Sequence, residues 1–124
     1  MATKKADLNT GKATLQRVVG ARLTSVQFVM DYLILGFDER GALTTLVWPE
    51  ICAEQRILQF GMEGYRDHLC QLITETIDDA DVTAEETIIF TFRNQTRLRI
   101  PLRRKELPGE RAIFNAPKQG LYVW

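Results

Sequence analysis

The sequence predicts an α+β domain, with an antiparallel sheet built from two β-meanders and one main helix packed on one face. Three observations lead to this fold class. Two stretches rich in β-branched and aromatic residues have the composition and alternation of strands. The stretch between them changes to the three-and-four spacing of a helix. The two strand-rich stretches also resemble each other, which indicates an internal repeat.

Length and composition indicate one soluble domain. The chain has 124 residues, of which 45% are hydrophobic and 26% charged, and its 16 basic residues balance 16 acidic ones. Such values exclude long disorder, and no apolar run reaches the roughly 18 residues that cross a bilayer. Residues 1–12 are polar and are expected to form a flexible leader without a secretory signal, followed by the single domain, residues 13–124. Two cysteines favour a reducing, cytoplasmic location over a disulfide scaffold.

The first meander is expected within residues 23–48, because Pro49 ends this apolar stretch. Its second hairpin is expected to have a three-residue loop, 39–41, whose last residue is a glycine suited to the left-handed conformation. That register would pair, on one face, Phe37 with Leu43, Leu35 with Thr45 and Leu33 with Val47.

The main helix is predicted over about residues 62–77. Spacings of three and four place its apolar residues on one stripe, formed by Met62, Tyr65, Leu69, Leu72, Ile73 and Thr76. The opposite side is polar, so the helix is expected to lie on the sheet with one face. An acidic stretch, residues 78–86, follows it.

The second meander is expected to contain strands at 87–93 and 97–102 around a loop at 94–96. A shift of 55 residues superposes the two hairpins, placing Leu33 on Ile88, Ile34 on Ile89, Leu35 on Phe90, Phe37 on Phe92 and Leu43 on Leu98. The expected inner face of the second hairpin sets Ile88, Phe90 and Phe92 against Leu98, Ile100 and Leu102.

The first hairpin is apolar on both faces. Its second face would pair Tyr32 with Trp48 and Ile34 with Leu46. Since one helix covers only one face, the second face is covered either by the segment 51–60, by Tyr122 and Trp124, or by a partner. Exposed apolar patches mark interfaces, and two-fold homodimers are the commonest oligomers. The first hypothesis is therefore a non-enzymatic protein-interaction domain that forms a homodimer through this face.

The outer face of the second hairpin is basic. The expected register sets Arg93 opposite Arg97, Thr91 opposite Arg99 and Thr87 opposite Arg103. Facing arginines repel unless an acidic group or an anion lies between them. Either the acidic stretch 78–86 neutralises Arg93, Arg97, Arg99 and Arg103, or these residues contact an acidic partner, as in an immunity-type or adaptor protein. Nucleic acid is not expected, because no recognition motif is present and the net charge is zero.

No catalytic, cofactor or metal site is predicted. His68 and Cys70 are two residues apart on the helix and point to different sides, and Cys52 and Cys70 are expected to be buried. No cysteine or histidine pair has metal-ligand spacing, and the acids at 78–81 lack the glycine and final glutamate of a calcium loop. A third hypothesis is a small-molecule binder or enzyme, with a pocket between helix and sheet lined by Tyr65, His68 and an arginine.

The C-terminal third carries the pattern Phe92-x5-Leu98-Arg-Ile-Pro-Leu102, then Pro108-Gly-Glu-Arg-Ala112 and Tyr122-Val-Trp124. In this pattern the chain resembles small bacterial proteins of unknown function, in which a similar course follows a hydrophobic helix. Gly109 and Arg111 depart from it. The resemblance covers residues 84–124 and, more loosely, residues 23–48. It implies a product of a mobile gene cassette or an immunity-type protein that neutralises a toxin by binding it, and it brings no enzymatic activity.

Overall fold

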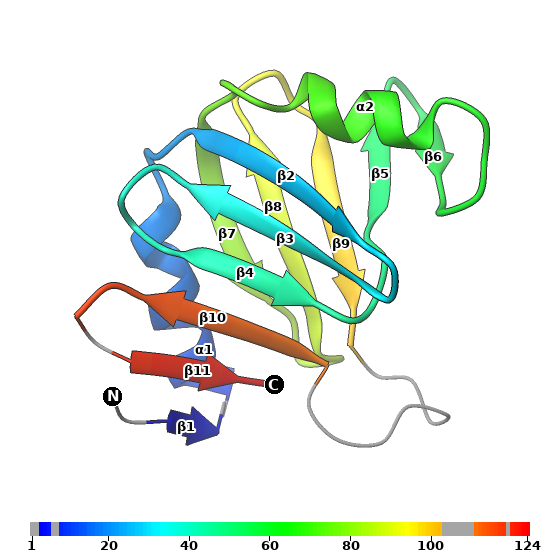
Figure 1. Ribbon diagram of the computed structural model, residues 1–124. Coiled ribbons are helices and arrows are strands. Elements are labelled where there is room, and N and C mark those ends of the chain that lie inside the picture. Colours follow the sequence, from blue (N-terminus) through cyan, green and yellow to red (C-terminus); the bar gives the residue numbers. More distant parts are fainter. Residues whose placement is uncertain (1–2, 6–7, 103–110, 119) are drawn as a thin grey trace.

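The computed structural model describes residues 3–5, 8–102, 111–118 and 120–124, and these form two packed β-sheets with two short helices (Figure 1). The elements are β1 (Thr3–Lys5), α1 (Leu8–Leu15), the 3-10 helix η1 (Gln16–Val18), β2 (Leu23–Val29), β3 (Tyr32–Phe37), β4 (Ala42–Thr45), β5 (Glu50–Ala53), β6 (Arg56–Leu58), α2 (Tyr65–Gln71), β7 (Ile77–Val82), β8 (Thr87–Phe92), β9 (Arg97–Pro101), β10 (Ala112–Ala116) and β11 (Gly120–Val123). The predicted α+β class is confirmed, but the strands form two sheets rather than one.

The sheets pack face to face around the core. Sheet I has the order β1-β11-β10-β4-β3-β2 and sheet II the order β6-β5-β9-β8-β7. All pairings are antiparallel except that of β1 with β11. The predicted inner faces are confirmed, since Leu33, Leu35, Phe37, Ile88, Phe90, Phe92, Leu98, Ile100 and Leu102 are all buried. The rings of Phe37 and Phe90, one from each sheet, lie 5.1 Å apart.

The internal repeat is visible in the structure. A shift of 55 residues carries β3 onto β8, and the turns that follow have the same hydrogen bonds. The Arg40 N–H donates to the Phe37 carbonyl, and the Gln95 N–H donates to the Phe92 carbonyl. A shift of 54 residues carries β2 onto β7, and both strands have a register irregularity at their second residue. The duplication therefore extends over both meanders.

The hairpins that follow the meanders are exchanged between the repeats. β5–β6 follows the first meander in the chain, yet β5 pairs with β9 of the second. β10–β11 follows the second meander, yet β10 pairs with β4 of the first. The helices are exchanged as well, because α1 packs against β7 and α2 against β2. Each sheet thus contains strands of both repeats.

The two repeats meet along the starts of β2 and β7. The Gly20 N–H donates to the Ile77 carbonyl, and the Thr74 N–H donates to the Leu23 carbonyl, each at 2.8 Å. Gly20 and Thr74, which correspond to each other in the repeat, both have positive φ angles, of 89° and 83°. This pairing brings one edge of sheet I beside one edge of sheet II.

The expectation that residues 1–12 form a flexible leader is wrong for the described part of this segment. β1 adds to the edge of sheet I beside β11, and α1 begins at Leu8. Leu15 and Val18, which follow, are fully buried in the core. Burial of Leu15 and Val18 therefore anchors α1 and the residues that follow it in the core.

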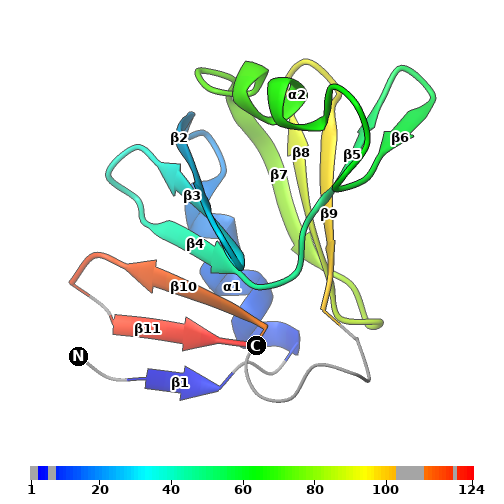
Figure 2. The ribbon, with the colours of Figure 1, turned by 45° about the vertical axis from the view of Figure 1, so that its right-hand side comes forward.

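The main helix is shorter than the predicted 62–77. It spans only Tyr65–Gln71, because Gly64 before it and Thr74 after it have left-handed backbone conformations. Thr74 to Ile77 instead pair with the start of β2. The helix also does not lie flat on a sheet face, since α2 crosses the upper end of both sheets (Figures 1 and 2).

Both hairpins close one residue earlier than expected. In sheet I, Leu35 lies opposite Leu43 and Leu33 opposite Thr45, so the predicted pairs of Phe37 with Leu43 and Leu33 with Val47 do not form. The loop contains residues 38–40, and the Phe37 N–H donates to the Gly41 carbonyl. A loop displaced by one residue moves the pairing by two, so every side chain keeps its predicted face.

Candidate functional site

The two sheets present different outer faces. In sheet I the strands β2, β3, β4, β10 and β11 contain no charged residue, and only the edge strand β1 brings lysines. In sheet II the strands β5, β6, β7 and β9 all contain charged residues. Because the sheets are repeats of one another, their outward positions are comparable. The fold itself therefore accepts either kind of face.

The outward side of sheet I combines half-buried apolar residues with neutral polar ones. Cross-strand pairs place Ile34 beside Thr44 and Thr44 beside Ile113. We call this surface the neutral face and define it by its half-buried apolar residues Val29, Tyr32, Ile34, Ile113 and Leu121. Neither helix covers it, since α1 lies behind sheet I and α2 lies at its upper end (Figure 1). Within the part of the chain that the structure describes, no helix thus shields the neutral face.

The four residues predicted to form an apolar surface are only partly brought together. Tyr32 and Ile34 point outward on β3, and Leu46, 43% exposed, lies just beyond β4. The expected pairs Tyr32–Trp48 and Ile34–Leu46 do not form, because Ile34 lies opposite Thr44. Three contributors were missed, Val29, Ile113 and Leu121. The alternation in 112–116 and 120–123 was the available signal for the last two.

Trp48 lies in an aromatic cluster instead of on the neutral face. Its ring stacks on Phe60 at 4.2 Å and faces Phe28 at 6.4 Å. The Arg66 guanidinium lies 5.8 Å from the centre of the Phe60 ring. The segment 51–60 thus covers Trp48 through Phe60, which is one of the alternatives expected from the sequence. Phe60 itself remains 45% exposed.

The arginines of the second hairpin do not face one another. Arg97 lies opposite Thr91 rather than Arg93, and Arg99 lies opposite Ile89. Arg93 forms an ion pair with Asp78 at 3.3 Å, so the acidic stretch neutralises this residue. Arg99 forms an ion pair with Glu50 of β5, also at 3.3 Å. Arg103 lies outside the described residues.

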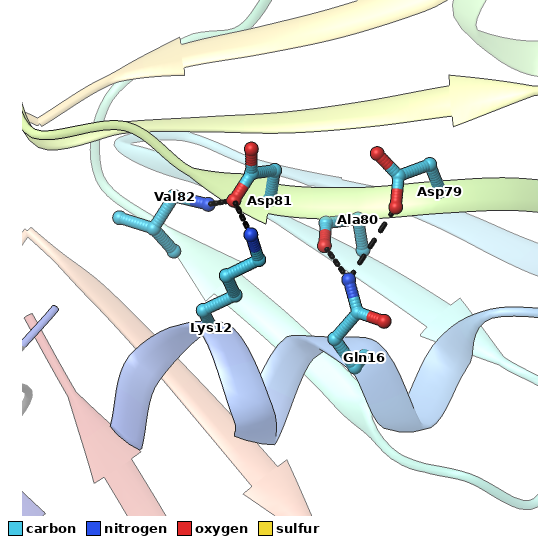
Figure 3. Close-up of polar contacts among 6 residues, drawn as sticks. All are labelled: Lys12, Gln16, Asp79, Ala80, Asp81 and Val82. Atoms are coloured by element: carbon cyan, nitrogen blue, oxygen red, sulfur yellow. Dashed lines mark hydrogen bonds and ion pairs between the residues drawn. The ribbon is translucent and has the colours of Figure 1, made fainter. Parts of the chain in front are cut away.

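The other acids of β7 are bound by α1 and η1 rather than by arginines (Figure 3). Lys12 forms an ion pair with Asp81 at 3.4 Å. The Gln16 side-chain amide donates to the Ala80 carbonyl at 2.7 Å and to the Asp79 carboxylate at 3.4 Å. These contacts tie the first repeat to the edge of the second. Among the described residues, no group of three or more His, Cys, Asp or Glu side chains has the geometry of a metal site.

Sheet II carries an open groove at its β5–β6 end. The groove has a volume of 640 Å³ and lies between the β5–β6 hairpin and β9. Three arginines, Arg56, Arg97 and Arg99, and one carboxylate, that of Glu54, line it together with Cys52. Arg97 lies directly opposite Cys52 in the sheet. Cys52 is half-buried, and Cys70 is exposed, so the expectation that both cysteines are buried is wrong.

The Tyr65 side chain packs in the core instead of lining a pocket between helix and sheet. Its side chain is 2% exposed, and its hydroxyl donates to the Pro49 carbonyl at 2.5 Å. Burial, together with the nearby Glu50 carboxylate, raises the pKa of Tyr65 well above its usual range. His68 turns its ring Nδ1 to the Gly64 carbonyl of its own helix, at 3.1 Å. The two polar groups proposed for such a pocket therefore have partners within the domain.

No family model, curated protein or solved structure matches the chain. The fold and the geometry of its surfaces are therefore the basis for a proposed function. No helix of the described residues is long and apolar enough to span a bilayer.

Proposed function

We propose that this chain is a non-enzymatic protein-interaction domain that self-associates through the neutral face. One observation carries the proposal. The outward side of sheet I lacks charged residues on five adjacent strands, whereas β7 and β9 of the repeated sheet II carry charges where β2 and β4 carry none. Depletion of charged side chains is characteristic of the buried centre of interfaces.

The comparison between repeats strengthens this interpretation. Ala42 and Thr44, on the outward side of sheet I, correspond to Arg97 and Arg99 of sheet II. Charged side chains thus fit these outward positions without harm to the fold. Their absence from sheet I is consistent with a surface that is buried in an assembly.

A second copy of the chain is the partner that the charges favour. In a two-fold dimer the same patch meets itself, so a charge close to the two-fold axis would face a like charge. The neutral strands avoid this repulsion. The whole chain, with 16 basic and 16 acidic residues, also carries no net charge that would keep two copies apart.

A matched pair of variants tests the proposal. Ile34→Glu places a carboxylate on the neutral face, and Ile89→Glu makes the same change at the corresponding position of sheet II, beside Arg99. A buried, unpaired carboxylate costs several kcal/mol, and a two-fold interface contains it twice, so dimer affinity should fall by at least about a thousandfold.

Sedimentation velocity gives the readout, with circular dichroism to verify folding. We expect Ile34→Glu to be a folded monomer and Ile89→Glu to remain a dimer. Ile113→Glu, on a neighbouring strand of the same face, should also be a monomer. Equal behaviour of the Ile34 and Ile89 variants, or a monomeric unmodified protein, would refute the proposal.

A further inference from the structure

We propose that the groove on sheet II binds the phosphate group of a small anionic molecule, held by Arg97 and Arg99 with Arg56 at its rim. This site is separate from the proposed dimer surface, because it lies on the outer side of the other sheet. Its volume, 640 Å³, is in the range of small-molecule sites, about 300–1,000 Å³.

The arginines are not required by the fold. At the corresponding positions of sheet I, Ala42 and Thr44 form the same hairpin with no charge. Arg97 is exposed, and its neighbours across the sheet, Cys52 and Thr91, are uncharged. Within the described part of the chain, neither Arg97 nor Arg56 forms an ion pair. Two guanidinium groups are thus available to an external anion.

The neighbouring contacts place the third guanidinium. Arg99 is bound to Glu50 Oε1 at 3.3 Å, and the other oxygen of the same carboxylate accepts a bond from the Gln59 amide at 2.8 Å. This arrangement fixes one end of the guanidinium. Its remaining N–H groups can donate to a ligand, since guanidinium has five donors.

The spacing suits phosphate. Arg97 and Arg99 are two residues apart on β9, so they point to the same face about 7 Å apart. Planar guanidinium forks bind phosphate oxygens in pairs, and two of them can hold a phosphate or diphosphate from both sides. Glu54 and Gln55, both with positive φ, form the tight turn between β5 and β6 and line the groove, so three guanidinium groups stand against one carboxylate there.

Calorimetric titration with inorganic pyrophosphate tests the site. Arg97→Ala should weaken binding at least about tenfold, because it removes a charge-assisted hydrogen-bond donor from the phosphate. Arg97→Lys should recover part of the affinity, because lysine keeps the charge but not the fork. Arg93→Ala is the matched control, since it removes one arginine that is paired with Asp78 and does not line the groove. It should change affinity less than twofold.

The alkylation rate of Cys52, which also lines the groove, gives a second readout of binding. In a Cys70→Ser background, pyrophosphate should slow the alkylation of Cys52 by iodoacetamide severalfold, and Arg97→Ala should remove this protection. Equal losses for the Arg93 and Arg97 variants, or absence of protection, would overturn the proposal. Binding of hexaglutamate in preference to pyrophosphate would also overturn it, in favour of an acidic protein partner. These results do not depend on the Ile34 variants, so each proposal fails on its own.

Discussion

Replacement of Gly41 by alanine tests whether the exchanged hairpin β10–β11 holds the two repeats together. Gly41 has a φ of 134°, and a Cβ there would lie 2.6 Å from Cζ of Phe114 and 2.7 Å from the carbonyl oxygen of Asn115. Both contacts belong to β10, which the second repeat contributes to sheet I. The close approach of β10 thus requires a residue without a side chain.

Two costs combine in this variant. The left-handed conformation costs a non-glycine residue about 1–2 kcal/mol. Displacement of packed atoms costs about 1–3 kcal/mol more, and a backbone oxygen cannot move as freely as a side-chain end. We therefore expect Gly41→Ala to lower the free energy of unfolding by about 2–5 kcal/mol, and the melting temperature by about 10–20 °C.

Gly61→Ala is the matched control. Gly61 has a φ of 93°, but a Cβ there would meet no atom within 4 Å. This variant should lose only the conformational cost, about 1–2 kcal/mol. Urea unfolding followed by circular dichroism measures both. If Gly41→Ala is no less stable than Gly61→Ala, β10 does not pack on the hairpin of the first repeat as described.

Three further changes have expected outcomes. Tyr65→Phe leaves the buried Pro49 carbonyl without its donor and should lower the free energy of unfolding by about 1–3 kcal/mol at neutral pH. Because the pKa of Tyr65 is higher in the folded than in the unfolded protein, the unmodified protein should lose stability as the pH rises above about 10. The variant should lose less, and urea unfolding at several pH values would measure the difference. Phe60→Ala removes the ring stacked on Trp48 and should lower stability by about 1–2 kcal/mol, with Trp48 emission shifted to the red; unchanged emission would contradict the stacking. Arg93→Ala breaks only an exposed ion pair with Asp78, so unfolding should change by less than about 1 kcal/mol, and a larger loss would show that the pair matters more than its exposure suggests.

Much of the fold follows from the sequence because side chains alternate along strands. That alternation correctly assigns Leu35 and Phe90 to the core, and the repeat relates their hairpins. The exact pairing does not follow from it. Asp38 accepts a bond from the Arg22 N–H, and the Arg93 N–H donates to the Thr76 carbonyl, so tertiary contacts draw both residues into the loops.

The exchange of hairpins between the repeats could not be predicted from the sequence either. No strand was predicted at residues 112–116, although apolar residues alternate there, and nothing in the local pattern indicates that β10 pairs with β4 from the other repeat. For the same reason Ile113 could not be placed beside Thr44, and Arg97 could not be placed beside Cys52. Both candidate surfaces depend on pairings between residues that are far apart in the chain, which periodicity alone does not specify.

The most direct test of the proposed function is the molar mass of the unmodified protein, measured by size exclusion with light scattering over a wide range of concentration. Self-association through the neutral face predicts a mass near twice 14.2 kDa that declines only on strong dilution. A constant mass of 14.2 kDa at every concentration would contradict it, and the neutral face would then have no role in binding a second copy.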